Sequence, residues 1–491
     1  SNTTGAAATV NLSIGGVSAG KTVTLLFSNG TASAAATTPS SGVLASPAVA
    51  AEPGLAPVGA SAAPDRFAAA HDRMLQEQQK WAAWLHQVAP HATAAPDAAR
   101  LLTKVSASPA VGSSRVWNDT FASPAVAYNT TVDSVCSVPG GRNVVFWLDP
   151  NAVSAGNVKA GDMAALNTAY CGTGGGYGRL AALLGDAWGP VPAAYASQLI
   201  QDGAALQDIN VVVLNVPSST GWAGYFDSGN NLLKTVAGNA SSNEALVFFI
   251  NAGQIKLDRQ FVASTLIHES THMINFYQRT LTRNTNHDTW LEETSAMMSE
   301  DIVSPAVLGG YNKIGSYRLP SYLQTGGAVS YITWPQLSGP NYALGGAFGA
   351  FLNRRYGLAL YKQLVTNCND GTGTGQVSSY ACLDALIKSG GGVSFADEFA
   401  HFGATVFAKL APGSISGGRY GYPARSDSGY TLGAIDVSAL TTAVPAPTAL
   451  NSGYTATTHT YQVDTVPAGK TTYVRNGVSV PANTTLLVVV Q

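Results

Sequence analysis

The amino-acid sequence predicts an α+β fold in which a strand-rich part precedes a helical part, with small β-rich segments at both ends of the chain. Short apolar runs that are typical of buried strands lie early, at 143–148, 208–214 and 244–251. Segments with helical spacing of apolar residues are predicted at 160–170 and 177–187, between the first two strands. After the last strand they are predicted at 257–280, 288–302, 341–355, 357–366 and 393–410. Strands followed by a run of helices are typical of an α+β architecture.

The composition indicates a globular protein. Only 11% of the 491 residues are charged and 46% are hydrophobic, whereas disordered chains are highly charged and poor in apolar residues. The 26 basic residues nearly balance the 28 acidic ones and form no basic run, so no nucleic-acid-binding surface is expected. No apolar stretch reaches the roughly 18–20 residues that a membrane span needs, and none is expected.

The chain divides into five expected regions. Residues 1–33 and 426–491 are β-rich terminal segments, because the VSAGKT that begins at Val17 recurs as the VPAGKT that begins at Val466, each before a strand-like run. This repeat favours pairing of the two segments into one small sandwich. Residues 34–63 are rich in Ala, Ser and Pro and are interpreted as a linker. Residues 64–110 are expected to form a helical segment that braces the catalytic domain at 111–425.

One motif suggests a nucleotide site and is better explained as a turn. Gly15 to Thr22 matches the phosphate-binding loop pattern G-x-x-x-x-G-K-[ST], which must stand between a strand and a helix. The TVTLLF that follows alternates like a strand, and the AGKT at Ala468 recurs without the upstream glycine. We therefore predict a hairpin turn and no nucleotide site.

The four cysteines predict two local disulfides, Cys136–Cys171 and Cys368–Cys382, because each pair is close in sequence. Free buried thiols are the alternative, and no pair has the C-x₂-C spacing of a cysteine metal site. Disulfides persist in oxidising compartments. The chain opens without a charged start or an apolar segment, so it is either cytosolic or already trimmed. The cysteines favour export, and we expect a secreted, periplasmic or cell-surface protein.

The segment with the clearest chemistry is HESTH, at 268–272 within a run of helical periodicity. Residues four apart on a helix share a face, with Cβ atoms about 5–6 Å apart. His268 and His272 can therefore bind one Zn²⁺ at about 2.0–2.1 Å. Glu269 lies about 100° further around the helix. It flanks the metal, where its carboxylate can act as the general base toward a water molecule.

A third protein ligand is needed, and WLEETSAMMSED supplies carboxylates on a second helical segment. The small residues that follow the first two carboxylates would let this helix pack closely against the first. Glu292 and Glu293 point in different directions on a helix, and spacing alone does not separate them. Glu300 and Asp301 are candidates for orienting the metal-bound imidazoles.

The two segments, HESTHMINFYQ and WLEETSAMMSED, resemble the hyicolysin family of metallopeptidases, M30, within the gluzincin group. The resemblance is strongest over about 205–360 and includes NVVVLNV, GYFDS and EALVFFINA. It implies a zincin-type catalytic domain with Glu293 as the third ligand, and Glu292 where the family often has Asn. The chain departs from the family pattern at Ser270, Thr271 and Thr294, and none of these departures removes a metal ligand.

The resemblance also implies two features of substrate handling. In related gluzincins an edge strand above the zinc pairs with extended substrate, and the strand over 246–251 is the candidate here. Tyr342 begins a Tyr-x-x-Gly-x-x-Phe pattern that supplies the oxyanion-stabilising tyrosine in aminopeptidase-like members. A buried core tyrosine is the alternative. His287 and His401 are other possible donors, although a structural or solvated role is expected for both. The segments 227–231 and 369–371, which carry Asp227 and Asp370 among Asn and Gly, are expected to be ordinary turns rather than calcium sites.

These observations predict a zinc-dependent endopeptidase that acts on proteins or peptides. Two alternatives stay open. The chain could be an inactive or latent zincin that binds surfaces or carbohydrates, which the terminal β-rich segments motivate. It could also be an aminopeptidase, although no G-x-M-E-N-type strand motif appears near 244–251.

Overall fold

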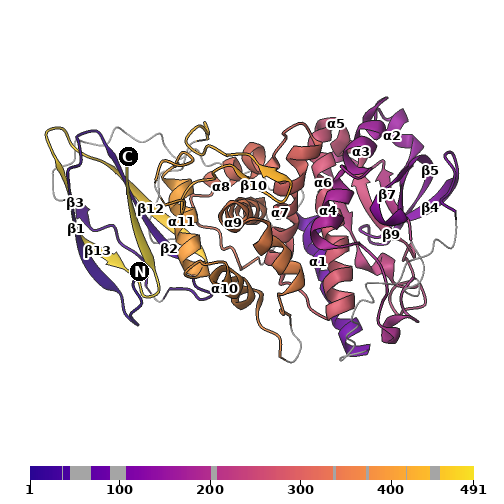
Figure 1. Ribbon diagram of the computed structural model, residues 1–491, viewed down its shortest axis with the longest axis horizontal. Helices are drawn as coiled ribbons and strands as arrows, with labels where there is room; N and C mark the ends of the chain where they lie inside the picture. The colour runs from indigo at the N-terminus through magenta and orange to yellow at the C-terminus, as the bar shows by residue number, and fades with distance from the viewer. Residues whose placement is uncertain are drawn as a thin grey trace.

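A computed structural model describes residues 1–35, 37–44, 68–88, 107–200, 207–334, 339–371, 375–415, 417–442 and 454–491. Three layers follow one another along the molecule's long axis (Figure 1). A β-sandwich lies at one end, a group of helices lies in the middle, and a six-stranded sheet lies at the other end. The α+β class predicted from the sequence is confirmed. Most of the predicted linker at 34–63 lies outside the described residues.

The six-stranded sheet has three parallel strands in its interior. Its order is β4-β5-β6-β7-β9-β8, and the interior strands β6, β7 and β9 are those predicted from the sequence. Helices and loops cover both of their faces, which explains their unbroken apolar runs. The bounds are β4 (Ser114–Asp119), β5 (Val126–Ser137), β6 (Asn143–Leu148), β7 (Ile209–Leu214), β8 (Gly224–Phe226) and β9 (Leu246–Asn251).

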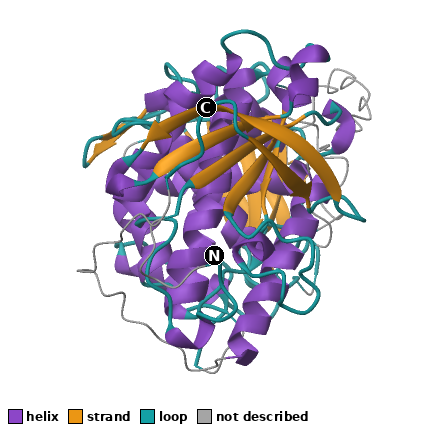
Figure 2. Ribbon diagram, turned by 90° about the vertical axis from the view of Figure 1, so that its right-hand side faces the viewer, coloured by secondary structure: helices purple, strands orange, loops and turns teal. Residues whose placement is uncertain are grey.

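The helices follow the predicted pattern with several additions, the longest of them α10. Figure 2, which looks onto the end of the molecule that carries the sheet, shows the strands curving across the helices. The helices are α1 (Ala68–Val88), α2 (Pro150–Ser154), α3 (Asp162–Tyr170), α4 (Gly176–Leu184), α5 (Ala252–Leu257), α6 (Arg259–Asn275), α7 (Thr289–Val307), α8 (Leu319–Leu323), α9 (Gly339–Thr366), α10 (Ser379–Ser389) and α11 (Phe395–Phe407). A π-helical turn over Phe276–Leu281 extends α6. Two helices predicted at 341–366 are one element that kinks at Gly357, whose φ is 68°.

The expectation that Leu246–Asn251 is an edge strand is wrong. This segment is β9, and it lies between β7 and β8. The strand beyond it is β8, which runs antiparallel to β9 and pairs Gly224 with Ile250. Three residues are too few to give a periodic signal in the sequence, so the true edge strand escaped prediction.

The β-sandwich is built from both ends of the chain. One sheet has the order β1-β13-β3 and the other β12-β2-β14, with an apolar cluster shared between them. The strands are β1 (Ala8–Gly15), β2 (Thr22–Asn29), β3 (Val43–Leu44), β12 (Thr458–Thr465), β13 (Thr472–Val480) and β14 (Thr485–Val490).

The Gly15–Thr22 turn joins β1 in one sheet to β2 in the other, so it is a crossover between sheets and not the predicted hairpin turn. A strand and not a helix follows it, as predicted. The expected boundary between residues 425 and 426 falls inside a small hairpin of β10 (Arg425–Asp427) and β11 (Tyr430–Leu432). This hairpin packs on α9 and α7 and belongs with the helices.

The helix α1 lies in the predicted bracing segment at 64–110, of which the structure describes 68–88 and 107–110. It packs against β8 and the adjoining turn over Ser228–Asn231, where the Trp81 indole lies so close that a Cβ on Gly229 would approach it to 2.8 Å. Gln79 Nε2 donates to Thr289 Oγ1 at 2.9 Å. The helix therefore bridges the edge of the sheet and the start of α7.

Both predicted disulfides are present. Cys136 is bonded to Cys171 and Cys368 to Cys382, which closes loops of 35 and 14 residues. No helix among the described residues is long and apolar enough to cross a membrane.

The sandwich predicts a stability effect of β2. Leu25 is fully buried between the sheets, and β2 hydrogen-bonds to both β12 and β14. We expect Leu25→Ala to lower the free energy of unfolding by about 2–5 kcal/mol, measured by chemical denaturation. The control is Val463→Ala on the neighbouring strand, whose side chain is largely exposed. Equal losses in the two variants would show that β2 is not part of the sandwich core.

Candidate metal centre

The two motif histidines lie on α6, in the interior of the protein. The helix begins after Asp258, whose carboxylate accepts the backbone N–H of Phe261 at 3.0 Å as an N-cap. His268 and His272 follow one turn apart, and their ring centroids are 4.8 Å apart. Both side chains are almost fully buried. The predicted helical placement of HESTH is therefore correct.

Glu293, on the adjacent helix α7, faces both imidazoles. Its Oε2 lies 3.1 Å from His268 Nε2, and its Oε1 lies 3.7 Å from His272 Nε2. Ligand atoms from all three residues lie within 4.8 Å of one another. Two atoms that bind Zn²⁺ at tetrahedral positions are about 3.3 Å apart, given bond lengths of about 2.0–2.1 Å. The donor set and its spacing thus fit a zinc ion held by two imidazoles and one carboxylate.

A glutamate carboxylate lies close to the second nitrogen of each imidazole. His268 Nδ1 lies 2.7 Å from Glu300 Oε1, and His272 Nδ1 lies 2.9 Å from Glu292 Oε1. Such carboxylate–imidazole pairs fix the ring orientation and leave Nε2 for a metal. Glu292 therefore sits behind His272, and Glu293 is the carboxylate that faces both Nε2 atoms. Asn275 Nδ2 holds Glu292 in turn, at 3.1 Å from each of its oxygens.

Lys313 is a member of this cluster that sequence reasoning missed. Its Nζ lies 3.1 Å from Glu300 Oε2, and its side chain is buried. The residue stands in a short segment between helices, and no spacing rule connects it to the motif. Asp301, the other predicted orienting residue, points elsewhere: its Oδ2 accepts from Arg354 Nη1 at 2.7 Å and lies away from both imidazoles.

The carboxylates dominate the electrostatics of the centre. Burial lowers the pKa of His268, but hydrogen bonds and charges from Glu293 and Glu300 outweigh it and raise the pKa to about 9. Burial raises the pKa of Glu300, but Lys313 and His268 lower it to about 2. The carboxylates therefore favour positive charge between the two helices. A bound cation would meet the same carboxylates, whose charge is costly to bury without a partner.

Small and hydroxyl side chains let α6 and α7 approach closely. Thr271 Oγ1 and Ser299 Oγ are 2.7 Å apart, and Ser264 Oγ and Ser304 Oγ are 2.9 Å apart. These pairs satisfy each other's polar groups inside the core. Thr271 is one of the departures from the family pattern, and its hydroxyl is used in this contact.

Glu269 lies on the face of α6 that the edge strand follows. Thr265, Glu269, His272 and Phe276 share this face by their spacing. At one end of β8, a Cβ on Gly224 would come within 2.8 Å of Thr265 Cγ2, so only glycine allows this approach. At the other end, the Phe226 and Phe276 rings are 6.2 Å apart. The strand β8 therefore passes alongside the carboxylate predicted to be the general base.

Tyr342 lies near the start of α9, beside the third-ligand helix. Its ring packs with Trp334, at a centroid distance of 5.3 Å, and with Met297, which is one turn beyond Glu293. The Arg318 guanidinium stands 5.4 Å from the ring centroid. The residue thus borders the helix that carries Glu293, and its role stays a prediction.

The other sequence candidates form structural contacts. His287 is buried and pairs with Asp370, and His401 Nδ1 lies 2.7 Å from the backbone oxygen of Asp397 on its own helix. The Asp370 carboxylate is surrounded by donors from Arg279, His287 and Ser379. Asp227 accepts from Gly229 N at 2.8 Å and caps a helical turn. The segments around Asp227 and Asp370 are thus turns held by hydrogen bonds.

Two comparisons bear on the identity of the chain. No curated protein matches it. The sequence model of the family described as Peptidase M30 matches residues 126–491, which include both helices of the candidate centre and exclude α1. This match covers most of the chain and agrees with the resemblance found at the two helical motifs. The protein belongs to the peptidase M30 family.

Proposed function

We propose that the protein is a zinc-dependent endopeptidase. The observation that carries the proposal is the convergence of His268, His272 and Glu293 within 4.8 Å, with a glutamate behind each imidazole. A buried site of two neutral donors and one carboxylate, oriented by further carboxylates, is typical of catalytic zinc. Membership of a peptidase family makes peptide bonds the expected substrate.

The residues around the centre would divide the work of hydrolysis. His268, His272 and Glu293 would hold the zinc ion, which when bound polarises a carbonyl and makes a water molecule more acidic. Glu269 takes a proton from the attacking water and returns it to the leaving amine. Tyr342 would stabilise the developing oxyanion by donating a hydrogen bond. The backbone of β8 offers the position along which an extended peptide pairs.

The two disulfides support export of the enzyme. Both connect buried or half-buried cysteines, and no free cysteine is present among the described residues. Structural disulfides persist in oxidising compartments. A secreted, periplasmic or cell-surface location is therefore part of the proposal.

The first prediction concerns Glu269. The parent protein should contain one zinc per chain and cleave an internally quenched peptide with a blocked N-terminus. Glu269→Gln should keep the zinc and lose about 10²–10⁴-fold in kcat, because it removes the proton acceptor and no ligand. Asp133→Asn, at an exposed carboxylate, is the control. A parent without zinc, or a Glu269→Gln variant with full activity, would contradict the mechanism. Cleavage only of peptides with a free N-terminus would favour an aminopeptidase.

The second prediction concerns the residues behind His268. Glu300→Gln and Lys313→Met should each weaken zinc binding, by about 10- to 100-fold for the glutamate, because they disturb the group that orients His268 Nδ1. Competition with a chelator of known affinity measures this directly. Glu398→Gln is the matched control, since that buried glutamate pairs with Arg355 away from the centre. Parental zinc affinity in Glu300→Gln would show that the pair does not support the metal.

We further propose that α1 restrains the enzyme, so that the chain as described is a partly latent form that keeps a low activity. The three proposed ligands, His268, His272 and Glu293, and the proposed base Glu269 are each at most 5% exposed. The helix α1, which the family match excludes, packs on β8 and on the turn that follows it. An extended substrate would need access to that strand. The position of α1 thus favours the latent-enzyme alternative over a permanently inactive binding protein.

The third prediction tests this latency. Trp81→Ala should loosen α1, raise activity toward the blocked peptide by on the order of tenfold, and speed hydrogen exchange of the β8 amides. A loss of about 1.4 kcal/mol in docking energy shifts the equilibrium tenfold. Gln76→Ala on the exposed side of α1 is the control. Faster exchange in β8 without any gain in activity would show that α1 does not restrain the enzyme.

A further inference from the structure

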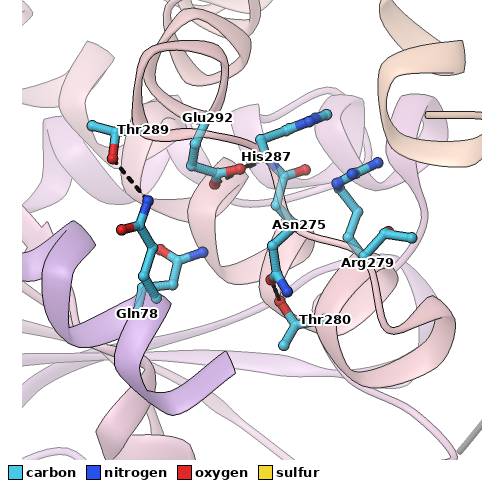
Figure 3. A pocket seen from close by; sticks show the side chains of 10 residues that line it. Gln78, Asn275, Arg279, Thr280, His287, Thr289 and Glu292 are labelled. Carbon is cyan, nitrogen blue, oxygen red and sulfur yellow. Dashed lines mark hydrogen bonds between the residues drawn. The ribbon is translucent and has the colours of Figure 1, made fainter. Parts of the chain in front are cut away.

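A polar pocket lies behind the metal centre, on the side away from the metal-facing nitrogens. It is small, with a volume of about 10 Å³, and Gln78 and Gln79 of α1 line one side of it. Figure 3 shows Glu292 on one side of this pocket and His287 near it, with Asn275 and Arg279 beside them. Glu292 is the carboxylate that accepts from His272 Nδ1, so this pocket borders the support of a proposed metal ligand.

His287 presents one imidazole nitrogen to this region and uses the other as an anchor. Its Nδ1 donates to Asp370 Oδ2 at 2.7 Å. This bond fixes the ring orientation and makes Nδ1 the protonated nitrogen. Nε2 is buried and has no hydrogen-bond partner among the described residues. His287 and Glu292 line the same pocket, and both side chains are buried.

Asp370 is itself held firmly. Ser379 Oγ donates to its Oδ2 at 2.6 Å, and the Arg279 guanidinium pairs with its Oδ1. Asp370 and Ser379 both lie between the bonded cysteines Cys368 and Cys382. The disulfide loop therefore presents a fixed carboxylate to His287.

Asp370 and Ser379 also fix the loop between α6 and α7, the two helices that carry the proposed metal ligands. The backbone N–H of Asn286 donates to the Asp370 carbonyl at 3.0 Å, and the N–H of Asp288 donates to Ser379 Oγ at 2.7 Å. Residues 282–288 run from the end of the α6 extension to the start of α7. Movement of this loop would change the distance between His272 and Glu293.

We propose that His287 and Asp370 are positioning residues of the metal centre. Asp370 holds the imidazole, His287 lines the pocket that Glu292 also lines, and Glu292 holds His272 in the orientation that a metal requires. This inference rests on the proposed zinc site. It adds two supporting residues that belong to no sequence motif. Neither residue is one of the three proposed metal ligands.

His287→Asn separates this role from simple anchoring of the loop. An asparagine amide can still donate to Asp370 but lacks the second ring nitrogen that His287 brings to the pocket beside Glu292. We expect zinc binding to weaken about tenfold, at the lower end of the range for residues behind a metal ligand, as measured by chelator competition. The melting temperature of the metal-free protein should stay close to that of the parent, since the anchor is kept.

His401→Asn is the matched control. His401, like His287, lies beside an aspartate, here Asp397, but both residues are on α11 and not in the loop between α6 and α7. Parental zinc affinity in a folded His287→Asn variant would overturn the inference and leave the zinc site intact. A parent that binds no zinc would overturn the proposed function as well. If His287→Asn does not fold, Ser379→Ala replaces it and removes only one donor to Asp370. A smaller loss of zinc affinity supports the inference, and unchanged affinity overturns it.

Discussion

The contact between α6 and α7 is the constraint on which the rest of this protein depends. It buries two imidazoles and several carboxylates, and moving a single ion from water into a protein interior costs several kcal/mol. The cost is offset only because each charged group meets an opposite or polar partner: Glu300 meets His268 and Lys313, and Glu292 meets His272 and Asn275. Such a cluster tolerates little change in helix spacing.

Several parts of the fold hold that spacing. Hydroxyl pairs such as Thr271 with Ser299 let the helix backbones approach without leaving polar atoms unsatisfied. The loop between the helices is attached to the disulfide-closed segment that carries Asp370. On the other side, β8 lies against α6 through Gly224 and aligns the edge of the sheet with Glu269. The helix α1 then covers this edge. Its position therefore affects how a ligand could reach the centre.

The two ends of the chain meet far from the centre. Strand β2 comes from the N-terminal segment and lies between β12 and β14 from the C-terminal segment. The α1 helix therefore follows a segment that is built into the sandwich. If the chain were cleaved between β2 and α1, β2 would keep its hydrogen bonds to β12 and β14. The strand pairing of the sandwich therefore does not depend on α1.

The sequence by itself determined the α+β class, the three central strands, both disulfides and the helix that carries HESTH, because each depends on local periodicity or short separation. It also singled out Glu293, though only through family resemblance, since neighbours on a helix cannot be ranked by spacing. Tertiary structure alone decided the edge strand, the roles of Glu292 and Glu300, and the places of Lys313 and His287. These depend on contacts between segments distant in the chain, and their energy comes from burial and pairing of charge, which no local pattern records.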